Sequence, residues 1–340
     1  AIKPRWTEGF RERHGLSLRR ISKKTLLSPE VISDRTQSFL AFIYYWTRGG
    51  RLPFDTIINF DEIPDSMSGK MSVSWTYDFQ GTVKVVGRES SGDFKRSATF
   101  VAAIGVTKEA DGSYTTLQIA PVVIHRTKNK ARINEHTPEA TAAGTLVLAS
   151  ETGVVTSRMM VDSIVPHILA SQEKKRTLVI LDSAKCHCTP AALASLRARG
   201  AVTAVVPGGL TPFVQFIDTH FAKVYRDERH QHYLSLAERP TTAISQRDFI
   251  VESTTRSYIA LSARMAEARA VEHAFRKLGY IVPPPPTPYT PDIYDGFVFA
   301  VPPLPAQEAP QRPEPPPKPM QRSLLEMFGA MRARESQPAA

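Results

Sequence analysis

The sequence predicts an α/β fold, because short apolar runs typical of buried strands alternate with longer segments of helical periodicity. The runs at residues 56–61 and 177–182 each end in an aspartate, and residues 246–278 carry apolar side chains at helical intervals. With 340 residues, 42% of them hydrophobic, the chain can form one large domain, or two smaller ones with tails.

The first fifty residues are predicted to be mainly helical. Residues 4–14 place Trp6 and Phe10 on one helix face, and Gly15 stands where a carboxyl-terminal cap belongs. A second helix is expected over residues 29–49. We expect this region, residues 1–50, to form a short helical amino-terminal arm.

Residues 51–240 are expected to form the main domain. Expected strands cover residues 56–61, 73–77, 98–106, 114–124, 177–182 and 202–206, with a hairpin turn at 110–112. Expected helices cover residues 159–169, kinked at Pro166, then 190–199 and 213–236. One or two further helices at 246–278 form a helical extension, residues 241–280.

The carboxyl-terminal region differs in composition. Residues 283–319 contain 15 prolines in 37 positions. Such a segment is extended and semi-rigid and cannot bury a core. We therefore expect a Pro-rich disordered tail over residues 281–340.

Positive charge dominates the chain, with 43 Lys and Arg against 33 Asp and Glu, a net charge of +10. Such an excess favours polyanionic partners, nucleic acid first, although a basic protein without one stays an alternative. Residues 3–24 hold eight Lys or Arg and two Glu, so they either lie along DNA phosphates or form a solvated basic helix. We expect the natural start to lie upstream of Ala1.

The number of cysteines and the length of the apolar runs indicate the cellular compartment. Two cysteines argue against a disulfide scaffold and fit a reducing compartment. No apolar run approaches the roughly 20 residues needed to span a bilayer, and we identify no secretory signal. We therefore expect an intracellular, soluble protein with no membrane partner.

Three aspartates carry the candidate chemistry. Asp61 and Asp182 each end a predicted strand, and in an α/β sheet ligands gather at that edge. Asp218 follows Asp182 by 36 positions, past a helix, a strand and a Gly-containing loop. Hard cations such as Mg²⁺ prefer carboxylate oxygens, and a pair of such ions can promote in-line displacement at a phosphate. Taken singly, each aspartate could instead be a turn former or a helix cap.

Several short motifs follow one another in a characteristic order. They are Asn59-Phe60-Asp61-Glu62, Val73-Ser74-Trp75-Thr76, Leu181-Asp182-Ser183-Ala184-Lys185-Cys186-His187, Val206-Pro207-Gly208-Gly209-Leu210-Thr211 and Val214-Gln215-Phe216-Ile217-Asp218. In this order, residues 5–236 resemble the pogo/Tigger/jerky branch of the mariner-type DDE (DDD) transposases, which is related to centromere protein B-like proteins. The segment Arg13-His14-Gly15-Leu16-Ser17-Leu18-Arg19 looks like the end of that family's helix-turn-helix. The resemblance therefore implies that residues 1–50 are the remnant of a DNA-binding domain with a linker helix.

The resemblance implies a ribonuclease-H-like fold, a mixed sheet with helices on both faces and an acid triad at one edge. It implies that Asp61, Asp182 and Asp218 are the catalytic ligands of Mg²⁺ or Mn²⁺, with Glu62 and His187 in support. The sequence departs from the family pattern at Ser183, Phe216 and Ile63. His187 could hydrogen-bond a metal ligand or a phosphate, or be a buried satisfied histidine.

The implied activity is that of a DNA transposase, an endonuclease with strand transfer that acts in the nucleus. The partner is double-stranded DNA, as transposon ends and target, and a homodimer is compatible with it. Basic residues expected to grip DNA are Arg11, Arg13, Arg19, Arg20, Arg126, Lys128, Lys130 and Lys185. The cluster at residues 125–130 could also be a basic loop without a partner.

Two alternative functions stay open beside the transposase. One is a domesticated, non-catalytic, sequence-specific DNA-binding protein of the same descent, which would not need the acids. The other is a metal-dependent nuclease without strand transfer, which the fold alone does not exclude. The three retained aspartates favour the transposase.

Two weaker motifs remain. Cys186-His187-Cys188 suggests zinc, but adjacent residues on one segment cannot close a tetrahedral site and no other cysteine exists, so we reject zinc. Gln321–Phe328 resembles the motif by which replication-associated proteins dock on the sliding clamp, with Met327 where an aromatic residue is usual. The alternative for that segment is an amphipathic tail without a partner.

Overall fold

The computed structural model describes eight stretches of the chain, all within the compact unit Ala1–Pro302. They are residues 4–20, 27–48, 54–65, 75–79, 98–127, 143–172, 175–235 and 243–302. No helix in these stretches combines the length and the apolar character that crossing a bilayer requires.

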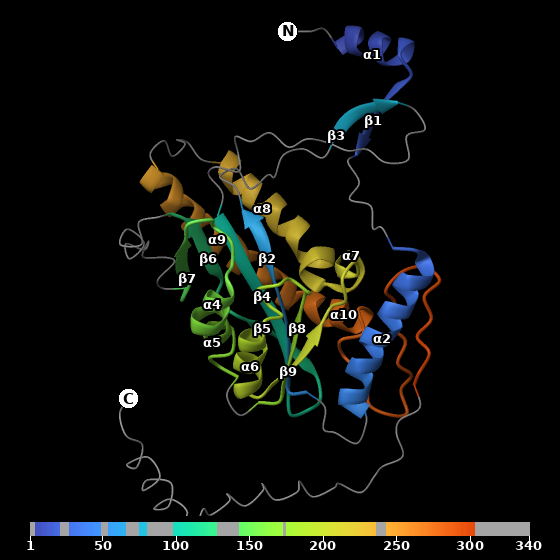
Figure 1. The fold of residues 1–340 in the computed structure, drawn as a ribbon, viewed down its shortest axis with the longest axis vertical. Coiled ribbons are helices and arrows are strands. Elements are labelled where there is room, and N and C mark those ends of the chain that lie inside the picture. Colours follow the sequence, from blue (N-terminus) through green and yellow to red (C-terminus); the bar gives the residue numbers. More distant parts are fainter. Residues whose placement is uncertain are drawn as a thin grey trace, which may run out of the picture. The chain divides into compact units, whose positions relative to one another are not determined.

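The described core is built on a seven-stranded mixed sheet with the order β7-β6-β4-β2-β8-β9 and β5 paired to β4 (Figure 1). Its central strand β2 is antiparallel to β4 and parallel to β8. The strands are β2 (Thr56–Asp65), β4 (Ala98–Lys108), β5 (Tyr114–Gln118), β6 (Val122–Arg126), β7 (Leu146–Ser150), β8 (Thr177–Leu181) and β9 (Ala201–Val205). The carboxyl ends of β2, β6 and β8 therefore lie at one edge of the sheet.

Helices cover both faces of this sheet, because its central strands are apolar on both sides. Ile57 packs into a cluster with α2, α7, η4, α8, α9 and α10, whereas Ile58 packs into a cluster with η3, α5 and α6. The helical elements are α2 (Pro29–Arg48), α4 (Ser157–Met159), η3 (Met160–Ile164), α5 (Val165–Ile168), α6 (Pro190–Ala198), α7 (Thr211–Val214), η4 (Ile217–Phe221), α8 (Ala222–Leu234), α9 (Ala243–Glu267) and α10 (Ala270–Lys277). The predicted architecture, a mixed α/β sheet with helices on both faces, is confirmed.

The amino-terminal segment contains a strand where the sequence suggested the end of a helix-turn-helix. Helix α1 (Pro4–Arg13) ends before Gly15, whose φ of +58° suits glycine. The chain then forms β1 (Leu16–Arg20), which pairs antiparallel with β3 (Trp75–Phe79). The helix-turn-helix interpretation of residues 13–19 is therefore wrong in local structure, because the alternating Leu16 and Leu18 pair with a distant strand.

Two expected elements are divided in the structure. The run at 114–124 forms β5 and β6, because Pro121 lacks the N–H that a continuous strand needs and both halves pair with β4. The helix expected at 159–169 becomes α4, the π-helical turn η3 and α5, with Pro166 in the first turn of α5. The missing N–H of a proline inside a helix accounts for this second interruption.

Strand β2 is longer than predicted. It continues past Asp61 to Asp65, because β4 pairs with it over ten residues, from Thr56 opposite Thr107 to Asp65 opposite Ala98. Strand β7 was not predicted at all. Asp61 therefore lies inside a paired strand, and its backbone is more firmly held than that of a strand-end residue.

Residues 281–302 do not follow the predicted disordered tail. Tyr289 and Phe299 are buried and pack on Tyr44 of α2. Their ring centroids lie 5.5 and 5.9 Å, respectively, from that of Tyr44. The side chain of Gln37 also bonds the backbone of Ala300. Aromatic residues between the prolines bury against a helix without needing regular structure, which the proline count alone did not indicate. Residues 303–340, including the segment Gln321–Phe328, lie outside the described residues.

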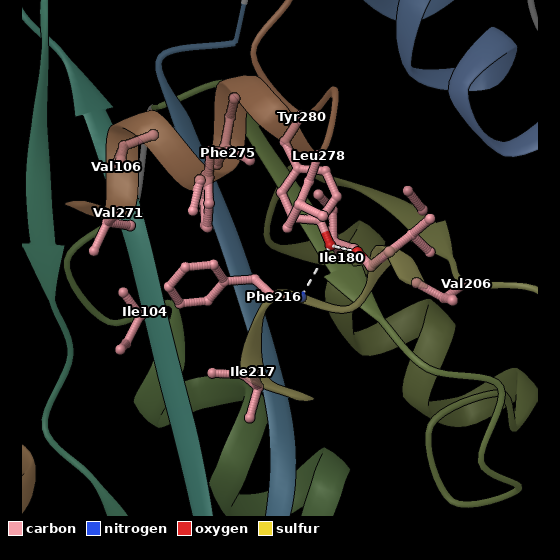
Figure 2. Packing of buried hydrophobic residues seen from close by; sticks show 14 of the residues in the cluster. Ile104, Val106, Ile180, Val206, Phe216, Ile217, Val271, Phe275, Leu278 and Tyr280 are labelled. Atoms are coloured by element: carbon pink, nitrogen blue, oxygen red, sulfur yellow. Dashed lines mark hydrogen bonds between the residues drawn. The ribbon is translucent and has the colours of Figure 1, made fainter. Parts of the chain in front are cut away.

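The segment that leads to Asp218 is fixed by the core beneath it. Figure 2 shows Phe216 pointing among buried apolar residues, and its ring packs edge-on against Phe275 at 5.1 Å. The hydroxyl of Tyr280 accepts a hydrogen bond from the backbone N–H of Phe216 at 3.3 Å and donates one to the carbonyl of Val214. These contacts set the position of η4 relative to the sheet.

Candidate metal centre

The first acid of the candidate site comes from the middle of the central strand. Asp61 is 6% exposed, and one carboxylate oxygen accepts the backbone N–H of Glu62 at 2.8 Å. The side chain of Glu62 is 19% exposed. An ionised carboxylate buried as deeply as that of Asp61 is costly unless a nearby positive charge compensates it.

The second acid is brought beside the first by strand pairing. In the parallel pair of β2 and β8, Asn59 stands opposite Ile180. Continued by two residues, this register places Asp61 level with Asp182, directly after the end of β8. Asp182 then starts a loop in which its Oδ1 accepts the N–H of Ala184 at 3.0 Å.

The third acid comes from a helical turn that follows β9 and α7. Asp218 is an exposed residue in the π-helical turn η4. The preceding residue, Ile217, donates its backbone N–H to Oδ1 of Asn59 at 3.0 Å, and Gln215 donates its side-chain amide to the carbonyl of Phe60 at 3.3 Å. The start of η4 is therefore tied directly to β2.

The acids share one electrostatic neighbourhood. Burial, and then the negative charges of Asp218, Glu62 and Asp182, raise the pKa of Asp61 to about 8. A carboxylate senses another charge in this way only at short range. The structure thus brings the three predicted acids together at one sheet edge, with Glu62 beside them. Their role as metal ligands stays a prediction.

His187 connects two members of this acidic group. The ring is fully buried, with Nδ1 2.6 Å from Oδ1 of Asp182 and Nε2 2.9 Å from Oε1 of Glu62. Burial lowers the pKa of His187, but hydrogen bonds to Asp182, Cys186 and Glu62 outweigh it and raise the pKa to about 12. A charged imidazole that donates to both carboxylates follows. Burial raises the pKa of Asp182, but its bonds to His187 and Ala184 hold it below the ordinary value.

A second set of possible metal ligands overlaps this network. One ligand atom each from Glu62, Cys186 and His187 lie within 4.8 Å of one another. The sequence motif of Cys186, His187 and Cys188 did not include Glu62, which comes from β2. Cys188 points its thiol elsewhere, 3.8 Å from the carbonyl of Asp182. Among the described residues this group offers three donors, one fewer than a closed structural zinc site requires.

The predicted DNA-gripping residues fall into three groups. Lys185 is exposed in the loop that follows β8, and Arg126 is exposed at the carboxyl end of β6, the same sheet edge as the acids. Arg11 and Arg13 lie in the last turn of α1. Arg19 and Arg20 lie on β1 and form the third group. Lys128 and Lys130 lie outside the described residues.

Two contacts near the site were not predicted from the sequence. Asn59 interrupts an apolar run of the sequence, and an Asn in such a place is a signal of a buried hydrogen bond. Arg35 of α2 donates to the carbonyl of Gly208 at 2.5 Å, in the loop after β9. A Cβ on Gly208 would lie 3.7 Å from the hydroxyl of Ser183, so this loop borders the one that carries Asp182.

Solved structures of a transposase resemble this chain. The Mos1 transposase paired-end complex with left transposon end is 11% identical, with a TM-score of 0.35, and the match covers 80% of this chain and 71% of that one. The catalytic domain of Mos1 mariner transposase is 12% identical, with a TM-score of 0.27, and the match covers 76% of this chain and 98% of that one. No family model and no curated protein matches the chain. At these identities and TM-scores, the superpositions are too loose to support a functional assignment.

Replacing Asp61 with asparagine should stabilise the metal-free protein. The folded pKa of Asp61 is about 8 and its ordinary value is 3.8. Between these values the unfolded chain releases a proton that the folded protein keeps, so the wild-type protein loses stability as pH rises from about 4 to about 8. We expect the variant to have a free energy of unfolding about 2–3 kcal/mol higher at pH 8. Urea unfolding in a chelator measures this, and a variant with the wild-type pH profile would contradict it.

Proposed function

We propose that the protein is a DNA transposase whose Asp61, Asp182 and Asp218 together hold two divalent metal ions. The observation that carries this proposal is the crowding of like charges around Asp61. Burial, and then the charges of Asp218, Glu62 and Asp182, raise the pKa of Asp61 to about 8. Such an arrangement is unfavourable in the protein alone and becomes favourable when cations neutralise it.

The donor set fits Mg²⁺ or Mn²⁺. All three aspartates offer oxygen, the ligand that these hard ions prefer. They come from three separate elements, β2, the loop after β8 and η4. Asn59 of β2 bonds both β8 and η4. Bound there, the ions would supply activation of an attacking oxygen and stabilisation of the leaving one at a phosphodiester.

Residues beside the acids have distinct roles in this proposal. His187 holds Oδ1 of Asp182 and Oε1 of Glu62 and so limits how the two carboxylates can turn. Lys185 and Arg126 are exposed near the same sheet edge and would contact DNA phosphates. The basic residues of α1 and β1 would extend that contact along the duplex.

The finer assignment rests on the sequence motifs. From them we propose the pogo/Tigger/jerky branch, transposon ends and target DNA as substrates, action in the nucleus and a homodimer as the working form. A contact of Gln321–Phe328 with the sliding clamp is part of the same proposal. Retention of all three aspartates favours an active enzyme over a domesticated DNA-binding protein.

The test is cleavage of duplex DNA that carries the terminal repeats of the element, with and without metal. We expect Mg²⁺ or Mn²⁺ to support cleavage and strand joining, and a chelator to abolish both, because the acids alone cannot activate the attacking oxygen. Cleavage without joining would point to a nuclease. DNA binding without cleavage in either metal would point to the domesticated alternative and contradict the proposal.

A further inference from the structure

We infer that Asn59 is a positioning residue that sets the spacing of the three acids, an inference that rests on the proposed metal-binding role of Asp61, Asp182 and Asp218. Asn59 is fully buried in β2, two residues before Asp61. It is a polar side chain in the middle of a strand that is otherwise almost entirely apolar at this point.

The amide of Asn59 bonds both of the other acid-bearing segments. Its Nδ2 donates to the carbonyl of Ile180 at 3.0 Å, two residues before Asp182. Its Oδ1 accepts the N–H of Ile217 at 3.0 Å, one residue before Asp218. One side chain thus connects all three segments within two residues of each acid.

An amide suits this position because one neighbour must receive a hydrogen bond and the other must supply one. The N–H of Ile217 opens η4, and the first N–H groups of a helix lack partners within it. Leucine at position 59 would leave this N–H unsatisfied in a buried place. Aspartate would lose the donor to Ile180 and add another negative charge beside the acids.

Other contacts hold the segment before Asp218. Tyr280 bonds Val214 and Phe216, as Figure 2 shows for the latter, and Gln215 bonds the carbonyl of Phe60. Loss of the Asn59 bonds therefore leaves η4 attached to the core but frees its first turn to shift. This predicts a folded variant with a displaced third acid.

If Asn59 were only structural, its loss would lower stability without a separate effect on metal binding. The same strand offers a matched control. Thr56, the first residue of β2, is also fully buried, and its hydroxyl donates to Oε1 of Gln172 at 3.0 Å. Neither Thr56 nor Gln172 adjoins an acid of the site. Thr56→Val therefore removes a buried hydrogen bond from the same strand without touching the metal ligands.

The experiment measures Mn²⁺ affinity by electron paramagnetic resonance, with thermal unfolding in a chelator for each protein. Wild type is compared with Asn59→Leu, with Asn59→Ser as a smaller change should the leucine variant fail to fold, and with Thr56→Val. We expect the Asn59 variants to bind Mn²⁺ about 10–100-fold more weakly, the usual loss when a group that orients a metal ligand is removed. Thr56→Val should lose stability but keep wild-type affinity.

The outcomes separate the two proposals. If wild-type protein binds no Mn²⁺, the proposed function fails. If wild type binds Mn²⁺ and a folded Asn59 variant binds it equally tightly, the positioning role of Asn59 is overturned while the metal site stands. Equal weakening in Thr56→Val would also overturn it, because the effect would then follow from general loss of stability.

Discussion

Asp182→Asn should reduce metal-dependent DNA cleavage by more than about 100-fold, because a neutral amide is a poor substitute for a carboxylate that binds a hard cation. The fold should survive, since the Oδ1 of asparagine can still accept the bonds that His187 and Ala184 donate to Asp182. Single-turnover cleavage rates in Mn²⁺, with thermal unfolding measured alongside, test this expectation.

The matched control for this variant is Asp162→Asn. Asp162 lies on η3, its side chain is 55% exposed, and its partner is the exposed Arg158. The same chemical change there should leave the cleavage rate within about twofold of wild type, because exposed ion pairs contribute little. If Asp182→Asn cleaves as fast as Asp162→Asn, the three-acid mechanism is wrong.

Arg229→Met should lower the free energy of unfolding by about 3–5 kcal/mol, the usual cost of breaking a buried ion pair. Arg229 and Asp65 are 0% and 2% exposed as side chains, with Nε of the arginine 3.4 Å from Oδ2 of the aspartate. The same oxygen accepts bonds from Tyr225 at 3.0 Å and from Thr254 at 2.6 Å. Without Arg229, the charge of Asp65 would stay buried without its cation.

Urea unfolding at pH 7 measures this effect. Arg264→Met is the control, because Arg264 pairs with Glu228 at 2.7 Å while 56% exposed, and such a pair contributes about 1 kcal/mol or less. The double variant Arg229→Met with Asp65→Leu should recover much of the loss, since it removes the isolated charge as well. If both single variants lose the same small amount of unfolding free energy, the contacts of Asp65 with Arg229, Tyr225 and Thr254 do not stabilise the junction of β2, α8 and α9.

Local patterns in the sequence predicted most individual elements well. The apolar runs before Asp61 and Asp182 form β2 and β8, and the helical spacing of residues 29–49 forms α2. Such patterns are informative because a strand buried on both faces must be apolar throughout, whatever it pairs with. The turn at residues 110–112 likewise joins β4 to β5 as expected.

Patterns failed where a distant partner decides the local structure. Leu16–Arg20 becomes a strand because Trp75–Phe79 pairs with it, and β7 forms beside β6. Tyr289 and Phe299 bury against α2 although prolines surround them. Pairing partners of this kind are separated by many residues, so no short window of sequence contains them.

The sequence by itself determined the types of element, the excess of positive charge and the identity of three candidate acids. Only the tertiary structure decided that these acids meet, that His187 joins Asp182 to Glu62 and that Asn59 connects the three segments. The physical reason is that a strand's apolar character follows from its own residues. A carboxylate's pKa and its partners follow instead from strand register and helix packing, which depend on the whole chain.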